Sequence, residues 1–269
     1  MKGLYVVIES VDGGGKGTIL KGFRKYHEEK GDVVYSLDRS IEDLNDSEDI
    51  LSIYGTEDRI PRYHVLKEFL AKKGVFPSVF LVGEPTYSEL GKFIREVLIN
   101  KKTYSNYSSM TRVHAYAEDR HNLLERFILP ALEDGKNVYC TRNVTSSLVY
   151  QSTELNCSFD KIGGIHGNAF ALNNLPKFTI VSALDIKKVL ANLSRRDEKQ
   201  DDAFFENSDF QSVILPKYLG SELKEYLESK GTKMLYFNIP TDSTPEDTIN
   251  KSKELLKDLL SQRKLADFK

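Results

Sequence analysis

The stretch LYVVIESVDGGGKGT, residues 4–18, decides the fold that we expect for this chain. It begins with an apolar run of strand length, continues through a glycine-rich loop, and leads into a segment with helical periodicity. In this order, the N–H groups of the loop and the N-terminus of the helix surround one anion. We therefore predict a site for nucleotide phosphates, with a purely structural glycine-rich turn as the alternative.

The loop departs from the common pattern G-x-x-x-x-G-K-[ST] at two positions. Ser10 takes the place of the first glycine, and Gly17 takes the place of the hydroxyl residue after the lysine. Without that hydroxyl, Mg²⁺ lacks its usual direct protein ligand, so water or another side chain must replace it. The lysine still reaches the β- and γ-phosphates as a point charge. The predicted ATP-binding residues are Asp12, Gly13, Gly14, Gly15, Lys16, Gly17 and Thr18.

Apolar runs of strand length alternate with helix-like segments along the whole chain. They lie at residues 4–8, 33–37, 78–82, 137–140, 178–184 and 234–239. Strands that are apolar on both faces and alternate with amphipathic helices are typical of a parallel sheet covered on both sides. The chain has 269 residues, 40% of them hydrophobic, so we expect a single α/β domain over residues 1–269.

Residues 38–77 are predicted to be an insertion into this domain. Residues 38–58 are acidic and have few large apolar positions, and residues 61–74 have the pattern of a helix that ends at Gly74. A solvated surface excursion, a substrate lid and a subunit contact all remain open as its role. Residues 245–264 have the pattern of an amphipathic helix.

The composition excludes several classes of function. A net charge of −2, from 38 basic and 40 acidic residues, provides no field that would hold a polyanion, so we expect no nucleic-acid or membrane partner. No apolar stretch approaches the roughly 18 to 20 residues that cross a bilayer, and the N-terminus lacks the features of a signal peptide. We therefore expect a cytoplasmic protein. Cys140 and Cys157 are expected to be reduced, and the five histidines show no metal-binding spacing.

Four blocks together resemble the thymidylate kinase family in order and approximate spacing. They read ESVDGGGKGT (9–18), GEPTYSELGKFIREVL (83–98), YAEDRHNLLERFILPALEDGKNV (116–138) and TRNVTSSLVYQ (141–151). The resemblance implies a P-loop kinase fold with a parallel five-stranded sheet flanked by helices. It further implies transfer of the γ-phosphoryl group of ATP to dTMP with Mg²⁺, which gives dTDP for dTTP synthesis, and a homodimer.

The resemblance also implies roles for individual residues. Tyr116 would stack on thymine, Arg120 would contact the exocyclic oxygen of the base, and Arg142 would clamp the acceptor phosphate. Tyr150 would disfavour a 2′-hydroxyl, and Asp12 would hold the 3′-hydroxyl. Pairing with Glu118 or another carboxylate remains the alternative for Arg120. The other predicted acceptor-binding residues are Glu84, Arg95, Ser147 and Gln151.

Helical spacing supports two of these groups independently of the resemblance. Arg112, Tyr116 and Arg120 follow one another at intervals of four and can share a helix face. On the next predicted helix, Ser147, Tyr150 and Gln151 form one polar and aromatic face.

Residues 194–206, SRRDEKQDDAFFE, resemble the flexible lid over ATP in the same family. Arg195 and Arg196 would neutralise the transferring phosphoryl group. An ordinary solvated loop is the alternative reading. Together with Lys16 and Arg142, these two arginines complete the predicted catalytic set.

Three residues depart from the family at the expected site, namely Gly83, Thr141 and Asn143, which stand where the family has arginine, aspartate and tyrosine. Thr141 removes a carboxylate that could organise Mg²⁺, so metal binding would depend on Glu9, Glu84 and Asp12 with water. If each lost contact contributes about 1.5 to 3 kcal/mol, turnover would be roughly ten- to a hundredfold slower than in a relative that retains them.

Other functions remain open beside phosphorylation of dTMP. Another deoxynucleoside monophosphate could be the acceptor. A deoxynucleoside kinase also uses a phosphate loop and a glutamate at a strand end, where the glutamate deprotonates a hydroxyl. A nucleotide-binding protein without turnover is the third alternative.

Overall fold

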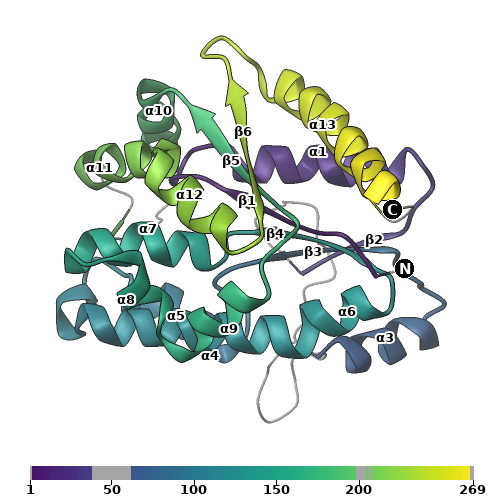
Figure 1. The fold of residues 1–269 in the computed structure, drawn as a ribbon, viewed down its shortest axis with the longest axis horizontal. Coiled ribbons are helices and arrows are strands. Elements are labelled where there is room, and N and C mark those ends of the chain that lie inside the picture. Colours follow the sequence, from purple (N-terminus) through teal and green to yellow (C-terminus); the bar gives the residue numbers. More distant parts are fainter. Residues whose placement is uncertain (1, 38–61, 198–203, 206–207, 267–269) are drawn as a thin grey trace.

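The computed structural model describes residues 2–37, 62–197, 204–205 and 208–266. Within these ranges, parallel strands form one six-stranded sheet in the order β2-β3-β4-β1-β5-β6 (Figure 1). The strands are β1 (Tyr5–Glu9), β2 (Val34–Ser36), β3 (Val79–Gly83), β4 (Asn137–Thr141), β5 (Phe178–Leu184) and β6 (Lys233–Ile239). Each apolar run of the sequence forms a strand, which confirms the α/β fold with a parallel sheet.

The sheet has six strands, one more than the resemblance implies. At one edge, β6 pairs with β5, in register from Phe178 opposite Lys233 to Leu184 opposite Ile239. Phe237 and Ile239, two residues apart, are buried on one face of β6, and Met234 is buried near its start. Because this strand buries one face against the core, it extends the sheet at its edge.

The central strand, β1, carries the phosphate loop at its carboxyl end. All five of its residues are buried, and it pairs with β4 on one side and β5 on the other. The chain therefore crosses to both sides of β1, and this reversal creates a crevice at the carboxyl ends of the strands, where open α/β sheets bind ligands. Burial of a continuous Val-Val-Ile run fixes the strand that presents the loop.

Helices cover both faces of the sheet (Figure 1). Helices α1 (Lys16–Glu28) and α13 (Pro245–Ala266) pack together on one face. A Cβ added at Gly22 of α1 would lie 1.8 Å from the Ser252 hydroxyl oxygen of α13, so the absence of a side chain at Gly22 allows this close approach. The opposite face carries α3 (Tyr63–Lys72), α5 (Ser109–Leu123), α6 (Leu129–Glu133), α7 (Val144–Leu155), α8 (Phe159–Gly163) and α9 (His166–Asn173).

Shorter or peripheral elements complete the chain. They are α4 (Glu89–Phe93), η1 (Ile94–Leu98), η2 (Tyr104–Asn106), η3 (Leu124–Ile128), α10 (Ile186–Asp197), α11 (Ser208–Leu219) and α12 (Ser221–Ser229). Two predicted helices are confirmed, because α3 lies within the predicted range 61–74 and α13 covers the predicted range 245–264. Gly74, with a φ of +74°, follows α3 as expected.

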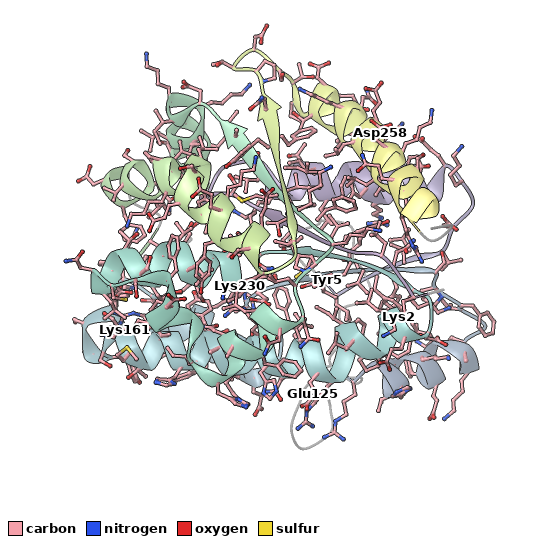
Figure 2. All side chains as sticks on the ribbon, viewed as in Figure 1. Lys2, Tyr5, Glu125, Lys161, Lys230 and Asp258 are labelled. Carbon is pink, nitrogen blue, oxygen red and sulfur yellow. The ribbon has the colours of Figure 1, made fainter. Side chains whose placement is uncertain are left out.

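Figure 2 draws the described side chains as sticks on the ribbon. Tyr5 lies near the centre, between the helical layers, and is 6% exposed. Glu125, Lys161 and Asp258 are exposed at the outline of the molecule. His27 is buried and bonded to Asp32 and Tyr139, which is a structural role, and both cysteines are free thiols.

Parts of two predicted segments lie outside the described residues. These are residues 38–61 of the insertion and residues 198–203 and 206 of the lid. Arg195 and Arg196 belong to the last turn of α10, but their side chains also lie outside the description. No helix in the described ranges combines the length and apolarity that a membrane crossing requires.

Candidate active site

A cleft of about 900 Å³ opens at the carboxyl edge of the sheet. Its walls come from the loop after β1, the ends of β3 and β4, helices α5 and α7, and the start of α13. Predicted site residues that are far apart in the sequence meet here. Those that line the cleft are Asp12, Gly13, Gly14, Gly15, Lys16, Gly17, Thr18, Glu84, Arg95, Tyr116, Arg120, Arg142, Ser147, Tyr150 and Gln151.

The loop after β1 has the backbone shape that its glycines allow. Gly13 and Gly15 have φ values of +75° and +90°, and Gly15 is the N-cap of α1. Among the described residues other than glycine, only Arg142 and Asn156 have a positive φ. Ser10 is therefore not in the left-handed region that would require glycine. The Ser10 hydroxyl donates to the Ser182 carbonyl at 3.1 Å. A serine in place of the first glycine therefore leaves the shape of the loop intact.

Ser10 and Gly14 are sterically matched. A Cβ added at Gly14 would lie 1.9 Å from the Ser10 hydroxyl oxygen. The space that a side chain would need at residue 14 is therefore filled by Ser10, which makes glycine at 14 a requirement of this particular loop. Gly17 is different, because a Cβ there would have no neighbour within 4 Å among the described residues.

Lys16 lies at the beginning of α1 and faces the cleft. Its ammonium group donates to the carbonyls of Ser10 at 3.0 Å and Val11 at 2.8 Å, and lies 3.9 Å from the Asp12 carboxylate. The side chain retains 13% exposure. The Lys16 ammonium and the positive N-terminal end of α1 thus lie side by side at the loop, and both favour binding of an anion.

Arg142 follows β4 and has a φ of +69°. Its guanidinium donates to Asp12 Oδ1 and, at 3.2 Å, to the Ser146 hydroxyl, and it lies 5.4 Å from the centre of the Tyr150 ring. Burial lowers the pKa of Arg142, but Asp12, Tyr150, Tyr218 and Glu9 together outweigh this effect and raise the pKa well above its usual value. The guanidinium is therefore a permanent cation in the cleft.

Asp12 accepts hydrogen bonds from several elements. Besides Arg142, it accepts from the Tyr150 hydroxyl at 3.1 Å and the Gln211 amide at 3.3 Å, and its own N–H donates to Gln211 Oε1 at 3.0 Å. Burial raises the pKa of Tyr150 above its usual value, so the phenol is neutral and donates. Gln211, on α11, was missed by the sequence analysis, because no motif marks it.

Arg120 is paired with a carboxylate, the alternative that the sequence left open. The partner is Glu84, whose Oε2 lies 2.8 Å from Arg120 Nε, and not Glu118. Arg120 also donates to the Asn143 carbonyl at 3.1 Å and to the Asn168 side chain, and it is 1% exposed. Three of its five N–H donors thus have protein acceptors, and the guanidinium holds β3, α7 and α9 together at the cleft wall.

The second oxygen of Glu84 is unusual. Oε1 is buried and has no hydrogen-bond partner among the described residues, and Glu84 lines the cleft. Burial raises the pKa of the Glu84 carboxyl to about 8, while Arg120 opposes this shift. A buried polar atom without a partner is costly, which makes it a position where a ligand atom can bind.

The loop after β3 is shaped by Asp119, which the sequence analysis did not single out. Its carboxylate accepts from Thr86 N–H at 2.7 Å, from the Thr86 hydroxyl at 2.6 Å and from the Ser88 hydroxyl at 3.0 Å. The Asp-Arg pair within YAEDR was the available signal. Arg95 donates to the carbonyls of Pro85 and Thr86, and its guanidinium stacks 4.0 Å from the Tyr87 ring centre.

Arg112 does not share the site with Tyr116 and Arg120. It is buried, bonded to the Tyr104 and Tyr107 carbonyls at 3.0 and 2.8 Å, and paired with Glu154. Sequence spacing alone therefore placed one arginine too many on the expected ligand face. Because an α-helix has 3.6 residues per turn, side chains at successive intervals of four rotate gradually around its axis.

Glu9 is buried behind the cleft. Among the described residues it is not part of the cleft wall, and each of its oxygens accepts two hydrogen bonds. This placement does not support the metal role predicted for Glu9. No group of three or more His, Cys, Asp or Glu residues in the described ranges could hold a metal ion without further ligands.

The opposite end of the cleft contains residues that the sequence analysis missed. Lys188 on α10 donates to the carbonyls of Thr241 and Ser243, both at 2.6 Å, and Asn192 donates to the Gly13 carbonyl at 2.8 Å. Two further lining residues are Thr244, directly before α13, and Thr248, near the start of that helix. Thr244 and Thr248 reach the cleft only because the chain after β6 folds back to the loop that follows β1. No local sequence pattern predicts this contact.

The fold and the cleft define a class of protein. A phosphate loop between a central parallel strand and its helix, faced by an arginine from the neighbouring strand, is the arrangement of a P-loop kinase. The chain belongs to the thymidylate kinase family, whose model matches residues 63–220.

Individual relatives agree with this assignment. A thymidylate kinase of Thermoanaerobacter sp. (strain X514) is 31% identical over 154 residues, which cover 57% of this chain and 72% of the relative. A thymidylate kinase of Caldicellulosiruptor saccharolyticus is 27% identical over 263 residues, which cover 98% of this chain and all of the relative. A thymidylate kinase of Ligilactobacillus salivarius is 28% identical over 221 residues, covering 81% and 84%. Similarity therefore extends beyond the range matched by the family model and includes the phosphate loop.

Proposed function

We propose that the protein transfers the γ-phosphoryl group of ATP to dTMP, giving ADP and dTDP. One observation carries the proposal: Lys16 and Arg142 meet at Asp12 within a single cleft. The Lys16 ammonium lies 3.9 Å from the carboxylate that Arg142 also contacts. A cation on the phosphate loop and a cation from the neighbouring strand are thus positioned to hold a donor and an acceptor phosphate next to each other.

The reaction needs positioning more than proton transfer. A phosphate monoester has a second pKa of about 6 and is largely dianionic near neutral pH, so the acceptor oxygen needs no general base. Lys16 and the N–H groups of the loop would bind the donor phosphates, and Arg142 would bind the acceptor phosphate. Catalysis then comes from alignment of the two anions and neutralisation of the charge that moves between them.

The acceptor nucleoside would occupy the wall formed by α5 and α7. Tyr116 offers a ring for the base, and Glu84 with Arg120 offers polar atoms for its edge. Tyr150 and Asp12, joined by a hydrogen bond of 3.1 Å, would lie at the sugar. The roles of Arg95, Ser147 and Gln151 in acceptor binding, and of Arg195 and Arg196 in catalysis, remain part of this proposal.

The donor set of the cleft suits a Mg²⁺ ion that is held mainly by the nucleotide and water. Mg²⁺ commonly takes only one or two carboxylates from a protein. Glu84 would supply that contact, since its Oε1 is buried without a protein partner among the described residues. When bound, the ion neutralises charge on the β- and γ-phosphate oxygens.

A deoxynucleoside kinase is a second candidate function, and the same oxygen of Glu84 favours it. A carboxylate at the end of β3, facing the cleft, could accept a proton from a nucleoside hydroxyl. Against it stands Arg142, a partly exposed cation beside the phosphate loop that a neutral acceptor would not need.

The test is ADP formation from ATP with dTMP, thymidine and each other common deoxynucleoside monophosphate in turn. We expect turnover to be highest with dTMP and to be lost in Lys16→Met. Turnover with thymidine but not with dTMP would establish the second candidate. Binding of ATP and dTMP without ADP formation above the Lys16→Met level would show a nucleotide-binding protein without turnover.

We also propose, from the family resemblance, that the protein is a cytoplasmic homodimer. Light scattering of the purified protein tests the assembly. A mass twice the 30.6 kDa of one chain supports the dimer, and the mass of one chain contradicts it.

A further inference from the structure

We propose that Glu9 is a positioning residue that holds Arg142 in place for the acceptor phosphate. The inference rests on the proposed function, because Arg142 is assigned to the acceptor there. Glu9 ends the central strand β1, and Arg142 follows the neighbouring strand β4. The two residues are connected through the backbone and side chains at the start of α7.

Glu9 is fully buried, and its carboxylate accepts four hydrogen bonds. Oε1 accepts from Asn143 N–H at 2.8 Å and Ser146 N–H at 3.2 Å. Oε2 accepts from the Ser146 hydroxyl at 2.7 Å and the Tyr218 hydroxyl at 3.1 Å. Three of these four bonds come from residues within four positions of Arg142.

Three of these hydrogen bonds come from the N-terminus of α7. Asn143 is the N-cap of α7, and Ser146 is the third residue of that helix. The Glu9 carboxylate therefore lies at the N-terminus of α7, where free N–H groups and the helix dipole favour an anion. Glu9 thereby ties the start of α7 to the central strand.

Arg142 needs such support because of its backbone. A φ of +69° is unfavourable for a residue with a side chain, and it persists only where the surrounding structure enforces it. Arg142 N–H donates to the Ile8 carbonyl at 3.0 Å, and the next residue, Asn143, donates to Glu9. The turn at Arg142 is thus held on both sides by consecutive residues of β1.

The side chain of Arg142 is held by the same group. Its Nη1 donates to the Ser146 hydroxyl at 3.2 Å, and that hydroxyl donates to Glu9 at 2.7 Å. One hydroxyl therefore links the guanidinium to the buried carboxylate. Through this link and the backbone of Asn143, Glu9 determines where Arg142 points.

The direct test is Glu9→Gln, which retains the shape of the side chain. Its amide NH₂ group cannot accept the hydrogen bonds that one carboxylate oxygen now accepts. We expect the KM for dTMP to rise about ten- to a hundredfold, as for the loss of hydrogen bonds to a charged group. The KM for ATP and the half-saturating Mg²⁺ concentration should change by less than about twofold, since neither depends on Arg142. A shift in the Mg²⁺ requirement with an unchanged KM for dTMP would overturn the proposal and make Glu9 a metal ligand.

A double-mutant cycle separates positioning from general destabilisation. In an Arg142→Ala background, Glu9→Gln should have little further effect on the KM for dTMP, because the residue it positions is absent. Equal effects of Glu9→Gln in both backgrounds would overturn the proposal. If Glu9→Gln does not fold, Ser146→Ala and Tyr218→Phe replace it. Ser146→Ala should raise the KM for dTMP more than Tyr218→Phe, and an unchanged KM in both variants would contradict the inference.

A structural readout keeps this test independent of turnover. The side-chain ¹⁵N signal of Arg142, assigned through Arg142→Lys, should shift in Glu9→Gln, while that of Arg112, which is bonded to Glu154, should not. If the unaltered protein forms no ADP with dTMP, the proposed function fails, yet this shift still reports on Glu9. An Arg142 signal that is the same in both proteins would overturn the inference even if dTMP is the substrate.

Discussion

Arg142 and Asp12 form an ion pair that joins the end of β4 to the loop after β1. The two side chains are 18% and 15% exposed, so the pair is partly open to the cleft. It places the cation assigned to the acceptor next to the loop assigned to the donor.

Removing the guanidinium should affect the acceptor more than the donor. Loss of one preorganised donor at a transferring group lowers the rate by about a hundred- to a thousandfold, and we expect this loss in kcat/KM for dTMP in Arg142→Ala. Steady-state kinetics with each substrate varied in turn measures it. Arg142→Lys is the matched control and should recover only part of the activity, because an ammonium cannot reproduce the guanidinium fork. A kcat/KM for dTMP that is unchanged in Arg142→Ala would exclude Arg142 from the site.

The match between Ser10 and Gly14 predicts a rescue. Gly14→Ala should weaken ATP binding, because its Cβ would lie 1.9 Å from the Ser10 hydroxyl oxygen. Ser10→Gly alone should be tolerated, and Ser10→Gly combined with Gly14→Ala should bind ATP more tightly than Gly14→Ala alone. Calorimetric titration with ATP provides the measurement. Rescue should be incomplete, since the same Cβ lies 3.0 Å from the Val11 carbonyl.

Gly17 offers a gain-of-function test. A Cβ at residue 17 meets no described atom within 4 Å, so a side chain fits there without rearrangement. Gly17→Ser restores the hydroxyl that phosphate loops usually offer to Mg²⁺, and we expect the half-saturating Mg²⁺ concentration to fall roughly threefold or more. Gly17→Ala, which adds the Cβ without the hydroxyl, should leave it unchanged. An equal response of both variants would show that the hydroxyl has no metal role.

The buried carboxyl of Glu84 predicts a pH dependence of stability. Burial raises its pKa from 4.5 to about 8, so between these values the folded chain binds more protons at this residue than the unfolded chain. The free energy of unfolding therefore contains a contribution that decreases as pH rises from about 4.5 to 8. Urea unfolding at several pH values, without metal, should show a steeper decrease in the wild-type protein than in Glu84→Gln. Parallel curves for the two proteins would show that Glu84 does not titrate in this range.

Local patterns were sufficient for the fold and for many of the residues that line the cleft. The run from Leu4 to Thr18 predicts a strand, a phosphate loop and a helix, because burial and helical periodicity act over neighbouring residues. The further apolar runs predict the remaining strands in the same way. Since parallel strands align their carboxyl ends at one edge, Glu84 and Arg142, which follow two of them, could be expected in one cleft.

Partner choice among charged side chains could not be predicted in this way. Arg112 and Arg120 have equivalent spacing from Tyr116, yet one is bonded to Glu154 outside the cleft and the other to Glu84 within it. Asn143, which departs from the family pattern, proves to be the N-cap of α7. Such roles depend on which elements lie side by side, and sequence spacing does not contain that information.

The amino-acid sequence by itself determined the order of strands and helices along the chain and the phosphate loop, because these depend on residues that are close along the chain. It also indicated the family, through four separate blocks in a characteristic order. Only the tertiary structure decided that Glu9 is buried behind the cleft, that Gln211 reaches Asp12, and that one oxygen of Glu84, a residue of the cleft wall, is buried without a protein partner in the described part of the chain. These contacts span up to about two hundred residues, and a hydrogen bond forms only where folding brings donor and acceptor within about 3 Å of each other.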